Sequence, residues 1–187
     1  MSKLETNTID TVSGTTNLTI GSTNSSTVTF ENGAVTGHMY PAFQANLSSN
    51  QTGISDATTA LVQLNNTELD TNSAFNTSTY TFTCPIAGKY FVYAKTTVLS
   101  SNTAREHYTY VYKNGSAILS NLMAFIGTTP IINDGSSFSG AQTSGIVDLA
   151  VNDTLKLYGK MNTTSGATFS FVSGIAETTL GAYRIGA

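Results

Sequence analysis

Charged residues are scarce in this chain, which has only 8 Lys and Arg and 11 Asp and Glu among its 187 residues. The charged fraction of 10% is well below the roughly 25% of typical soluble domains, so solubility must depend on Thr, Ser, Asn and Gly side chains. The net charge is -3 and the basic residues do not cluster, which argues against a nucleic-acid partner. Such a surface favours a subunit that packs beside identical copies, although it also suits an extracellular β-protein.

Cysteine and long apolar runs are also nearly absent. Cys84 stands alone, so no disulfide within the chain can stabilise the fold, and its place in a predicted strand favours a buried, unreactive thiol. No apolar run approaches the roughly 20 residues of a membrane-spanning helix, so membrane insertion is not expected. Residues 1–7 lack the apolar core of a secretory signal, which predicts synthesis in the cytoplasm.

Signatures of catalysis are missing. Only His38 and His107 could act as bases near neutral pH, and they lie in unrelated sequence contexts. Neither a phosphate-binding Gly-Lys-Ser/Thr loop nor a Gly-x-Ser-x-Gly elbow occurs. Asp134, Asp148 and Asp153 could supply oxygen ligands to calcium if their loops met, but isolated acidic residues are more typical of solvated loops. We therefore predict no enzyme, no cofactor and no metal site.

Residues 80–93 predict a strand, a corner and a second strand. Tyr80, Phe82 and Cys84 alternate with threonines, as in a half-buried strand. Pro85 and Gly88 favour a turn after it. The strand that follows is apolar on both faces, which predicts a sandwich core on one face and a contact between subunits on the other.

A second aromatic strand spans residues 107–113 and places three tyrosines on one face. Asn114-Gly115 then predicts a tight hairpin turn. This face could bind sugar rings, but burial between subunits is favoured. The predicted subunit interface combines the aromatic residues of both strands: Tyr90, Phe91, Tyr93, Tyr108, Tyr110 and Tyr112.

Residues 41–187 resemble the globular head of complement C1q and its tumour-necrosis-factor relatives. The resemblance rests on an ordered set of segments: AFQA (42–45), LVQLN (61–65), FTCPIAGKY (82–90), VYKNG (111–115), SGIVDLAVNDTLKL (144–157) and LGAYRI (180–185). It implies an all-β jelly-roll β-sandwich over residues 40–187 that assembles as a homotrimer with aromatic strand faces along its axis. Many such heads have Gly-Asp where this chain has Asn152-Asp153, but Asn also tolerates a left-handed backbone. The collagen-like stalk is absent, so functions tied to it are not implied.

Residues 1–39 predict a short β-rich arm. Apolar residues recur in pairs within a Thr, Ser, Asn and Gly background: Ile9 and Val12, Leu18 and Ile20, Val28 and Phe30. Such strands bury too little apolar area to offset their own ordering entropy. Three arms could wind round one another, or each arm could add a strand to another protein. A flexible linker is the less favoured alternative, because a linker does not need apolar residues at strand spacing.

The beginning and end of the chain also resemble structural proteins of tailed bacteriophages, notably cyanobacterial ones. Residues 4–20 and 181–186 carry this resemblance. It implies a virion structural protein made in the host cytoplasm and displayed on the virion surface as a trimeric spike, fibre or capsid decoration. The arm would bind another virion protein, and the head would project outward, where it could bind a host-surface glycan through loops near residues 100–103, 133–139 and 162–166. The alternative is a soluble trimeric carbohydrate-binding module that is not attached to a virion.

Overall fold

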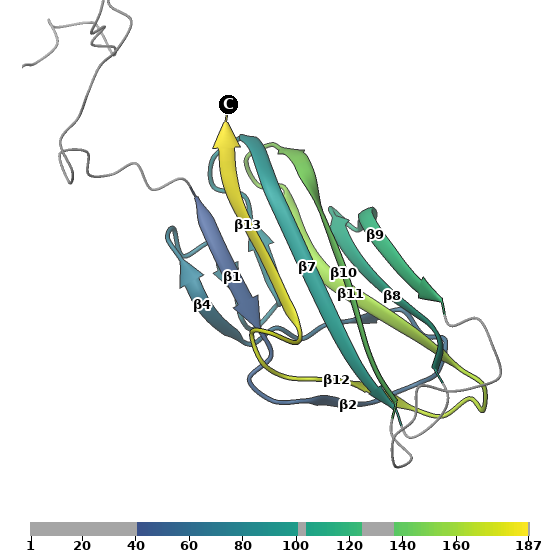
Figure 1. Ribbon diagram of the computed structural model, residues 1–187. Coiled ribbons are helices and arrows are strands. Elements are labelled where there is room, and N and C mark those ends of the chain that lie inside the picture. Colours follow the sequence, from purple (N-terminus) through teal and green to yellow (C-terminus); the bar gives the residue numbers. More distant parts are fainter. Residues whose placement is uncertain (1–40, 101–103, 125–136, 187) are drawn as a thin grey trace, which may run out of the picture. The chain divides into compact units, whose positions relative to one another are not determined.

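The computed structural model describes residues 41–100, 104–124 and 137–186 (Figure 1). The predicted arm with its six apolar residues (Ile9, Val12, Leu18, Ile20, Val28 and Phe30) lies outside them, as do His38 and Asp134. The boundary between residues 39 and 40 therefore stays a prediction. Within the described part of the chain, no helix is long and apolar enough to cross a membrane.

The described residues form strands joined by turns and loops, which confirms the all-β prediction. The strands are β1 (Ala42–Asn46), β2 (Gln51–Ile54), β3 (Ala60–Leu61), β4 (Asn66–Asp70), β5 (Phe75–Asn76), β6 (Thr81–Thr83), β7 (Gly88–Ser100), β8 (Ala104–Lys113), β9 (Ser116–Ala124), β10 (Ser137–Leu149), β11 (Thr154–Thr163), β12 (Phe169–Phe171) and β13 (Thr179–Gly186).

Two antiparallel sheets pack face to face (Figure 1). In the first, which we call the β7 sheet, β10 pairs with the whole length of β7, from Leu149 opposite Gly88 to Ser137 opposite Ser100. On its other side β7 pairs with β13 and β12, β13 continues to β1 and β4, and β12 continues to β2. The second, the β8 sheet, runs β5-β6-β11-β8-β9, and β3 also pairs with β11. Strands distant in sequence, such as β1 and β13, are therefore neighbours.

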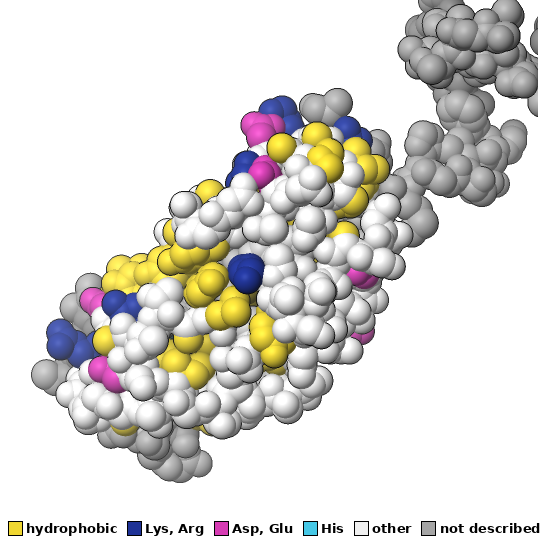
Figure 2. Space-filling model, turned by 180° about the vertical axis from the view of Figure 1, so that it is seen from behind, with side chains coloured by type: hydrophobic (Ala, Val, Ile, Leu, Met, Phe, Trp, Pro, Cys, Tyr) yellow, Lys and Arg dark blue, Asp and Glu magenta, His cyan; other side chains and the backbone are white. Residues whose placement is uncertain are grey.

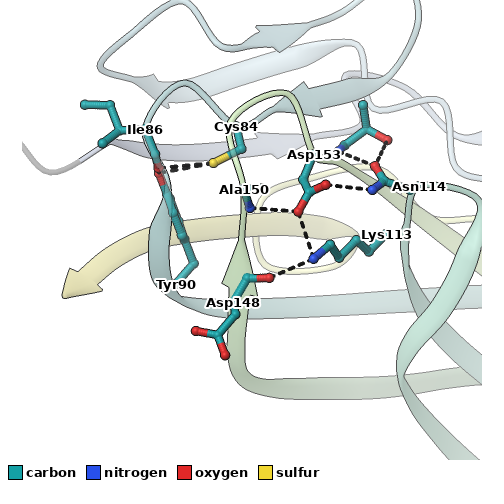
Figure 3. Close-up of polar contacts among 9 residues, drawn as sticks. Cys84, Ile86, Tyr90, Lys113, Asn114, Asp148, Ala150 and Asp153 are labelled. Carbon is teal, nitrogen blue, oxygen red and sulfur yellow. Dashed lines mark hydrogen bonds and ion pairs between the residues drawn. The ribbon is translucent and has the colours of Figure 1, made fainter. Parts of the chain in front are cut away.

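The core lies between the sheets and is rich in aromatic side chains. The ring of Phe43 stacks on that of Phe82 with centroids 4.3 Å apart, and Tyr90 meets Phe82 edge-on at 6.2 Å. Cys84 is 0% exposed, which confirms the prediction of a buried thiol. At the predicted corner the Tyr90 hydroxyl donates a 2.6 Å hydrogen bond to the Ile86 carbonyl oxygen (Figure 3). The corner is thus fixed by a side chain of the strand that follows it.

The tight turns follow the predictions in two places, and one strand boundary differs. Asn114 and Gly115 have φ values of 50° and 84° and connect β8 to β9, which confirms the hairpin. Asn152 has φ 71°, the left-handed conformation expected of it. Tyr80, predicted to begin a strand, has φ 57° and lies in a turn, so β6 begins at Thr81. The alternation of residues 80–84 extends one residue beyond β6 at each end.

Asp153 fixes the turn between β10 and β11 (Figure 3). Its carboxylate accepts hydrogen bonds from the Asn114 side chain at 2.7 Å and from the Ala150 backbone at 2.8 Å, and it forms a 2.8 Å ion pair with Lys113. The contact with Lys113, helped by these hydrogen bonds, lowers the pKa of the Asp153 carboxyl to about 2. The Asp148 carboxylate instead pairs with Lys89 at 2.7 Å. Both acidic side chains thus have structural partners, and within the described residues no group of three or more His, Cys, Asp or Glu could hold a metal ion.

Gly159 makes room for a side chain of the opposite sheet. β11 alternates strictly between inward and outward residues, and Gly159 lies where an inward side chain would be expected between Leu157 and Met161. A Cβ atom at this position would lie 2.5 Å and 2.7 Å from two ring carbons of Phe171. The phenyl ring of Phe171 occupies the space that any larger residue would need.

We expect Gly159→Ala to lower the free energy of unfolding by about 1–3 kcal/mol, because the added methyl group overpacks a closed core. Urea denaturation measures the change. Gly140→Ala is the matched control: it also lies in a strand, but its Cβ would keep ordinary 3.5 Å contacts with Lys95 and Thr97. Equal stability of the two variants would show that the Phe171 ring can move aside freely.

Candidate functional site

The structure divides the predicted interface residues among three places. Tyr90 is 0% exposed and points into the core, so it has no surface to offer a second subunit, and its assignment to the interface is corrected. Phe91 and Tyr93 lie on the outer face of the β7 sheet. The three tyrosines of β8 lie on the outer face of the β8 sheet, which points the opposite way. The predicted alternation along each strand is correct, but the prediction combined two faces that cannot belong to one flat contact.

An apolar row crosses the outer face of the β7 sheet. Ala42 lies opposite Tyr183, Tyr183 opposite Phe91, and Phe91 opposite Ile146, so four neighbouring strands contribute to it. The rings of Phe91 and Tyr183 are 5.5 Å apart. Ile146 is 64% exposed and Tyr183 46% exposed.

Tyr93 extends this apolar surface, because its ring and hydroxyl occupy the space that a Cβ atom on Gly181 would need. We call Ala42, Phe91, Tyr93, Ile146 and Tyr183 the aromatic band. Tyr183 and Ile146 were missed from the sequence because only the pairing of distant strands places them beside Phe91.

Beyond the aromatic band the same face becomes polar. Lys95, Gln142 and Thr179 lie in one row across β7, β10 and β13. A cavity of about 430 Å³ lies between these residues, the aromatic band and Asn121 of β9. Lys95 forms a 3.8 Å ion pair with Glu177 beside it. The outer face of the β7 sheet therefore has an apolar half next to a polar half that contains a cavity.

The strands β9 and β10 form one open edge of the sandwich. Within the described residues, β9 pairs only with β8, and β10 only with β7. The Asn121 side chain donates a 2.5 Å hydrogen bond to the Gln142 carbonyl oxygen and so holds the two edge strands together. Ile118, Leu122 and Met123 of β9 are 37%, 47% and 38% exposed. We call these three residues the apolar edge; an uncovered apolar edge strand is unusual in a monomeric protein.

The outer face of the β8 sheet carries a connected set of tyrosines. The rings of Tyr108 and Tyr110 are parallel with centroids 5.7 Å apart, Tyr110 and Tyr112 meet edge-on at 6.2 Å, and Tyr112 contacts Tyr158 at 4.3 Å. We call these four residues the tyrosine face. Figure 2, viewed from behind relative to Figure 1, shows hydrophobic side chains across this side of the molecule with Lys or Arg among them and acidic side chains toward the margins. Tyr158 was missed from the sequence because it is the single aromatic residue of β11, so no aromatic pattern marks this strand.

His107 is enclosed in a buried polar cluster. Its Nε2 atom lies 2.8 Å from the Thr96 hydroxyl and its Nδ1 atom 3.0 Å from the Ser139 hydroxyl, while the Thr96 and Thr109 hydroxyls are 2.6 Å apart. Burial lowers the pKa of His107 to about 4, so its ring is neutral at pH 7. With 0% exposure it cannot contact a molecule in solvent while the fold is closed. This geometry gives His107 a structural role.

The described flanks of the segments predicted to contact a receptor lie at one end of the sandwich. Ser100 pairs with both Ser137 and Phe169, so the described flanks of all three segments lie together. Residues 101–103 and 133–136 lie outside the described residues, and residues 137–139 belong to β10 instead of a loop. Nearby, Asp56, Arg105, Glu106, Asn162 and Thr163 line a polar cavity of about 300 Å³.

Comparisons with solved structures identify the fold. Eiger, a TNF from S. frugiperda, is 15% identical, with a TM-score of 0.57 over 79% of this chain and 92% of its own. Murine APRIL is 10% identical, with a TM-score of 0.55 over 78% of this chain and 99% of its own. The chain has a TNF-like jelly-roll fold. The jelly roll also aligns with the globular domain of zebrafish complement 1qA at 15% identity and a TM-score of 0.47, over 78% of this chain and 97% of that domain. No family model and no curated protein matches the sequence.

Proposed function

We propose that the chain is a structural subunit that assembles as a homotrimer through the aromatic band of one copy and the apolar edge of the next. The observation that carries this proposal is the pair of exposed apolar surfaces on one outer face and on the edge that adjoins it. Ile146 and Tyr183 on the face, and Leu122 on the edge, would leave water on assembly. Each buried apolar Å² contributes about 25 cal/mol.

The positions of the two surfaces favour a closed ring. A contact between two different patches closes into a ring only when the patches are suitably inclined to each other, whereas patches on opposite faces build an open stack. The aromatic band lies on a face and the apolar edge lies on the adjoining edge, so a ring can close. A two-fold dimer that buried only the aromatic band would leave Ile118, Leu122 and Met123 in water. The TNF-like jelly-roll fold and the resemblance of the sequence to complement heads also support a trimer.

We further propose that the trimer is a phage virion protein on the particle surface, as a spike, fibre or capsid decoration. The resemblance of residues 4–20 and 181–186 to phage structural proteins supports this assignment. In this arrangement residues 1–39 bind another virion protein and the jelly roll projects outward. Its work is mechanical attachment and, where a receptor is present, adhesion of three copies at once.

Co-sedimentation with phage particles tests the attachment role. We expect the tagged full chain, expressed in infected host cells, to sediment with particles, and a chain that starts at Tyr40 to stay in the supernatant as a trimer, because it lacks the anchoring segment. Sedimentation of both chains would contradict the anchoring role of residues 1–39. Sedimentation of neither would contradict the assignment to the virion.

A second candidate is a soluble trimeric carbohydrate-binding module. The tyrosine face supports it, because tyrosine rings offer apolar area with a polar hydroxyl at one end. In this case the full chain binds polysaccharide but does not sediment with particles.

A further inference from the structure

The tyrosine face is a connected aromatic surface on the outer side of the β8 sheet. It lies on the side of the sandwich opposite the aromatic band and meets the apolar edge at one margin, where Leu122 lies opposite Tyr108. A ring formed by the aromatic band and the apolar edge therefore covers that margin and keeps Tyr110, Tyr112 and Tyr158 in solvent. This inference therefore rests on the trimer part of the proposed function. The rings of Tyr108, Tyr110 and Tyr112 run along β8, and Tyr158 lies opposite Tyr110 on β11. Together they form a platform two strands wide.

Two lysines on β11 flank this platform. Lys156 lies opposite Tyr112 and Lys160 opposite Tyr108, and the Lys160 ammonium group lies 5.4 Å from the centre of the Tyr108 ring. The contact is a cation–π interaction, which holds the charge at the surface of the platform. Each end of the aromatic row therefore has a lysine beside it.

These two lysines differ from the other lysines that the structure describes. Lys89, Lys95 and Lys113 each lie within 4 Å of a carboxylate, at 2.7, 3.8 and 2.8 Å. Lys156 and Lys160 form no ion pair within the described residues. The acidic residue on this face, Glu106, already accepts hydrogen bonds from the Tyr108 hydroxyl at 3.2 Å and from the Asn162 amide at 2.5 Å. These neutral donors do not cancel the Glu106 charge, but two lysines against one glutamate leave this group of residues with a net positive charge, although the net charge of the chain is -3.

We propose that the tyrosine face binds an acidic polysaccharide, with sugar rings on the phenol rings and carboxylate or sulfate groups on Lys156 and Lys160. Pyranose rings expose flat C–H faces that pack on aromatic rings, and their hydroxyl groups pair with the tyrosine hydroxyls. The two lysines are four positions apart along one strand, a distance of roughly 13 Å. That separation requires a chain of several sugars.

A polysaccharide fits the face better than a nucleic acid does. Nucleic acids carry one charge per phosphate, and proteins that bind them neutralise several phosphates with clustered Lys and Arg. Here two cations lie on a chain with 8 basic and 11 acidic residues. The tyrosine face has few charges and much aromatic area. It therefore matches a polymer in which charged groups alternate with neutral ones. On the trimer, three such faces would point outward and multiply a weak single-site affinity.

Binding of the full chain to immobilised alginate, a polyuronate, tests the proposal, with neutral dextran and single-stranded DNA as comparison ligands. We expect alginate to bind in a salt-dependent manner and dextran to bind much more weakly. The double variant Lys156→Gln/Lys160→Gln should bind alginate about tenfold more weakly, because both charge contacts are lost. The single variant Lys160→Gln should also bind alginate more weakly than the wild type. Lys89→Gln, which removes one positive charge away from the tyrosine face, is the charge-matched control for this single variant and should bind as the wild type does. Tyr110→Phe keeps the ring and should lose less affinity than Tyr110→Ala.

Native mass, measured on the same samples, separates this proposal from the trimer. A trimer that does not bind alginate would overturn the polysaccharide proposal and leave the trimer intact. The same would follow if Lys89→Gln lost as much affinity for alginate as Lys160→Gln. Tighter binding of single-stranded DNA would overturn the choice of ligand. Dissociation of the trimer in Lys156→Gln/Lys160→Gln would place the tyrosine face between subunits. That result would also overturn the polysaccharide proposal. A monomeric wild-type chain would contradict the trimer itself.

Discussion

Ile146→Asp should convert the trimer into monomers. Ile146 is 64% exposed in the single chain and lies beside Phe91 in the aromatic band, so the proposed contact buries it. A carboxylate at this position would lose its water on assembly without a partner, which costs several kcal/mol per contact, and a ring repeats the contact three times. Multi-angle light scattering should show a threefold fall in mass. The jelly roll itself should stay folded, because the side chain does not contribute to the core.

Val151→Asp is the matched control for this experiment. Val151 is 53% exposed and lies in the turn between β10 and β11, outside both the aromatic band and the apolar edge. It introduces the same charge at a similarly exposed apolar position and should leave the trimer intact. If Ile146→Asp remained trimeric under the same conditions, the aromatic band would not be the contact.

The second large effect is a loss of stability in mild acid through His107. The pKa of His107 is about 4 in the folded chain, and it is about 6.5 for an unperturbed histidine in the unfolded chain. Below pH 6.5 the unfolded chain binds this proton first, so protonation favours unfolding. The stability that the neutral ring contributes is complete above about pH 7 and falls progressively as the pH drops through 6.5 toward 4. Over that interval the loss is about 3 kcal/mol, since each pH unit corresponds to about 1.4 kcal/mol.

Urea denaturation at fixed protein concentration between pH 7.5 and pH 4.5 measures this loss. The lower limit avoids the titration of Asp153, whose folded pKa of about 2 adds its own loss below about pH 4. His107→Gln can keep hydrogen bonds to Thr96 and Ser139 but cannot be protonated, so its stability should vary much less over the same interval. Parallel curves for the wild type and His107→Gln would contradict the assignment.

Sequence periodicity predicted local structure well because strands and turns impose local rules. The alternation in β7 and β8, the Asn114-Gly115 turn and the left-handed Asn152 all follow from neighbouring residues. Residues 61–65 show what such local rules leave out. Only Leu61 belongs to a strand, and Val62 and Leu64 are both fully buried, but the Leu64 amide donates to the Val62 carbonyl oxygen, so the chain turns there.

The candidate surfaces could be predicted only in part, because they depend on pairing between distant strands. The sequence shows that Tyr90 and Phe91 point to opposite sides of β7, but it does not show which side faces the core. The aromatic band needs Tyr183 beside Phe91, a pair separated by 92 positions along the chain. The tyrosine face likewise needs Tyr158 beside Tyr110. The sequence of each strand shows which residues share a face. Only the fold shows that the two aromatic faces lie on opposite sides of the sandwich.

The native mass of the full chain, measured by light scattering over a range of concentrations, tests the central claim most directly. The aromatic band and the apolar edge predict a mass of three times 19.7 kDa that persists on dilution. A mass of 19.7 kDa at every concentration would show that these surfaces do not join copies of the chain. A mass of twice this value would contradict the closed ring and indicate a two-fold contact instead.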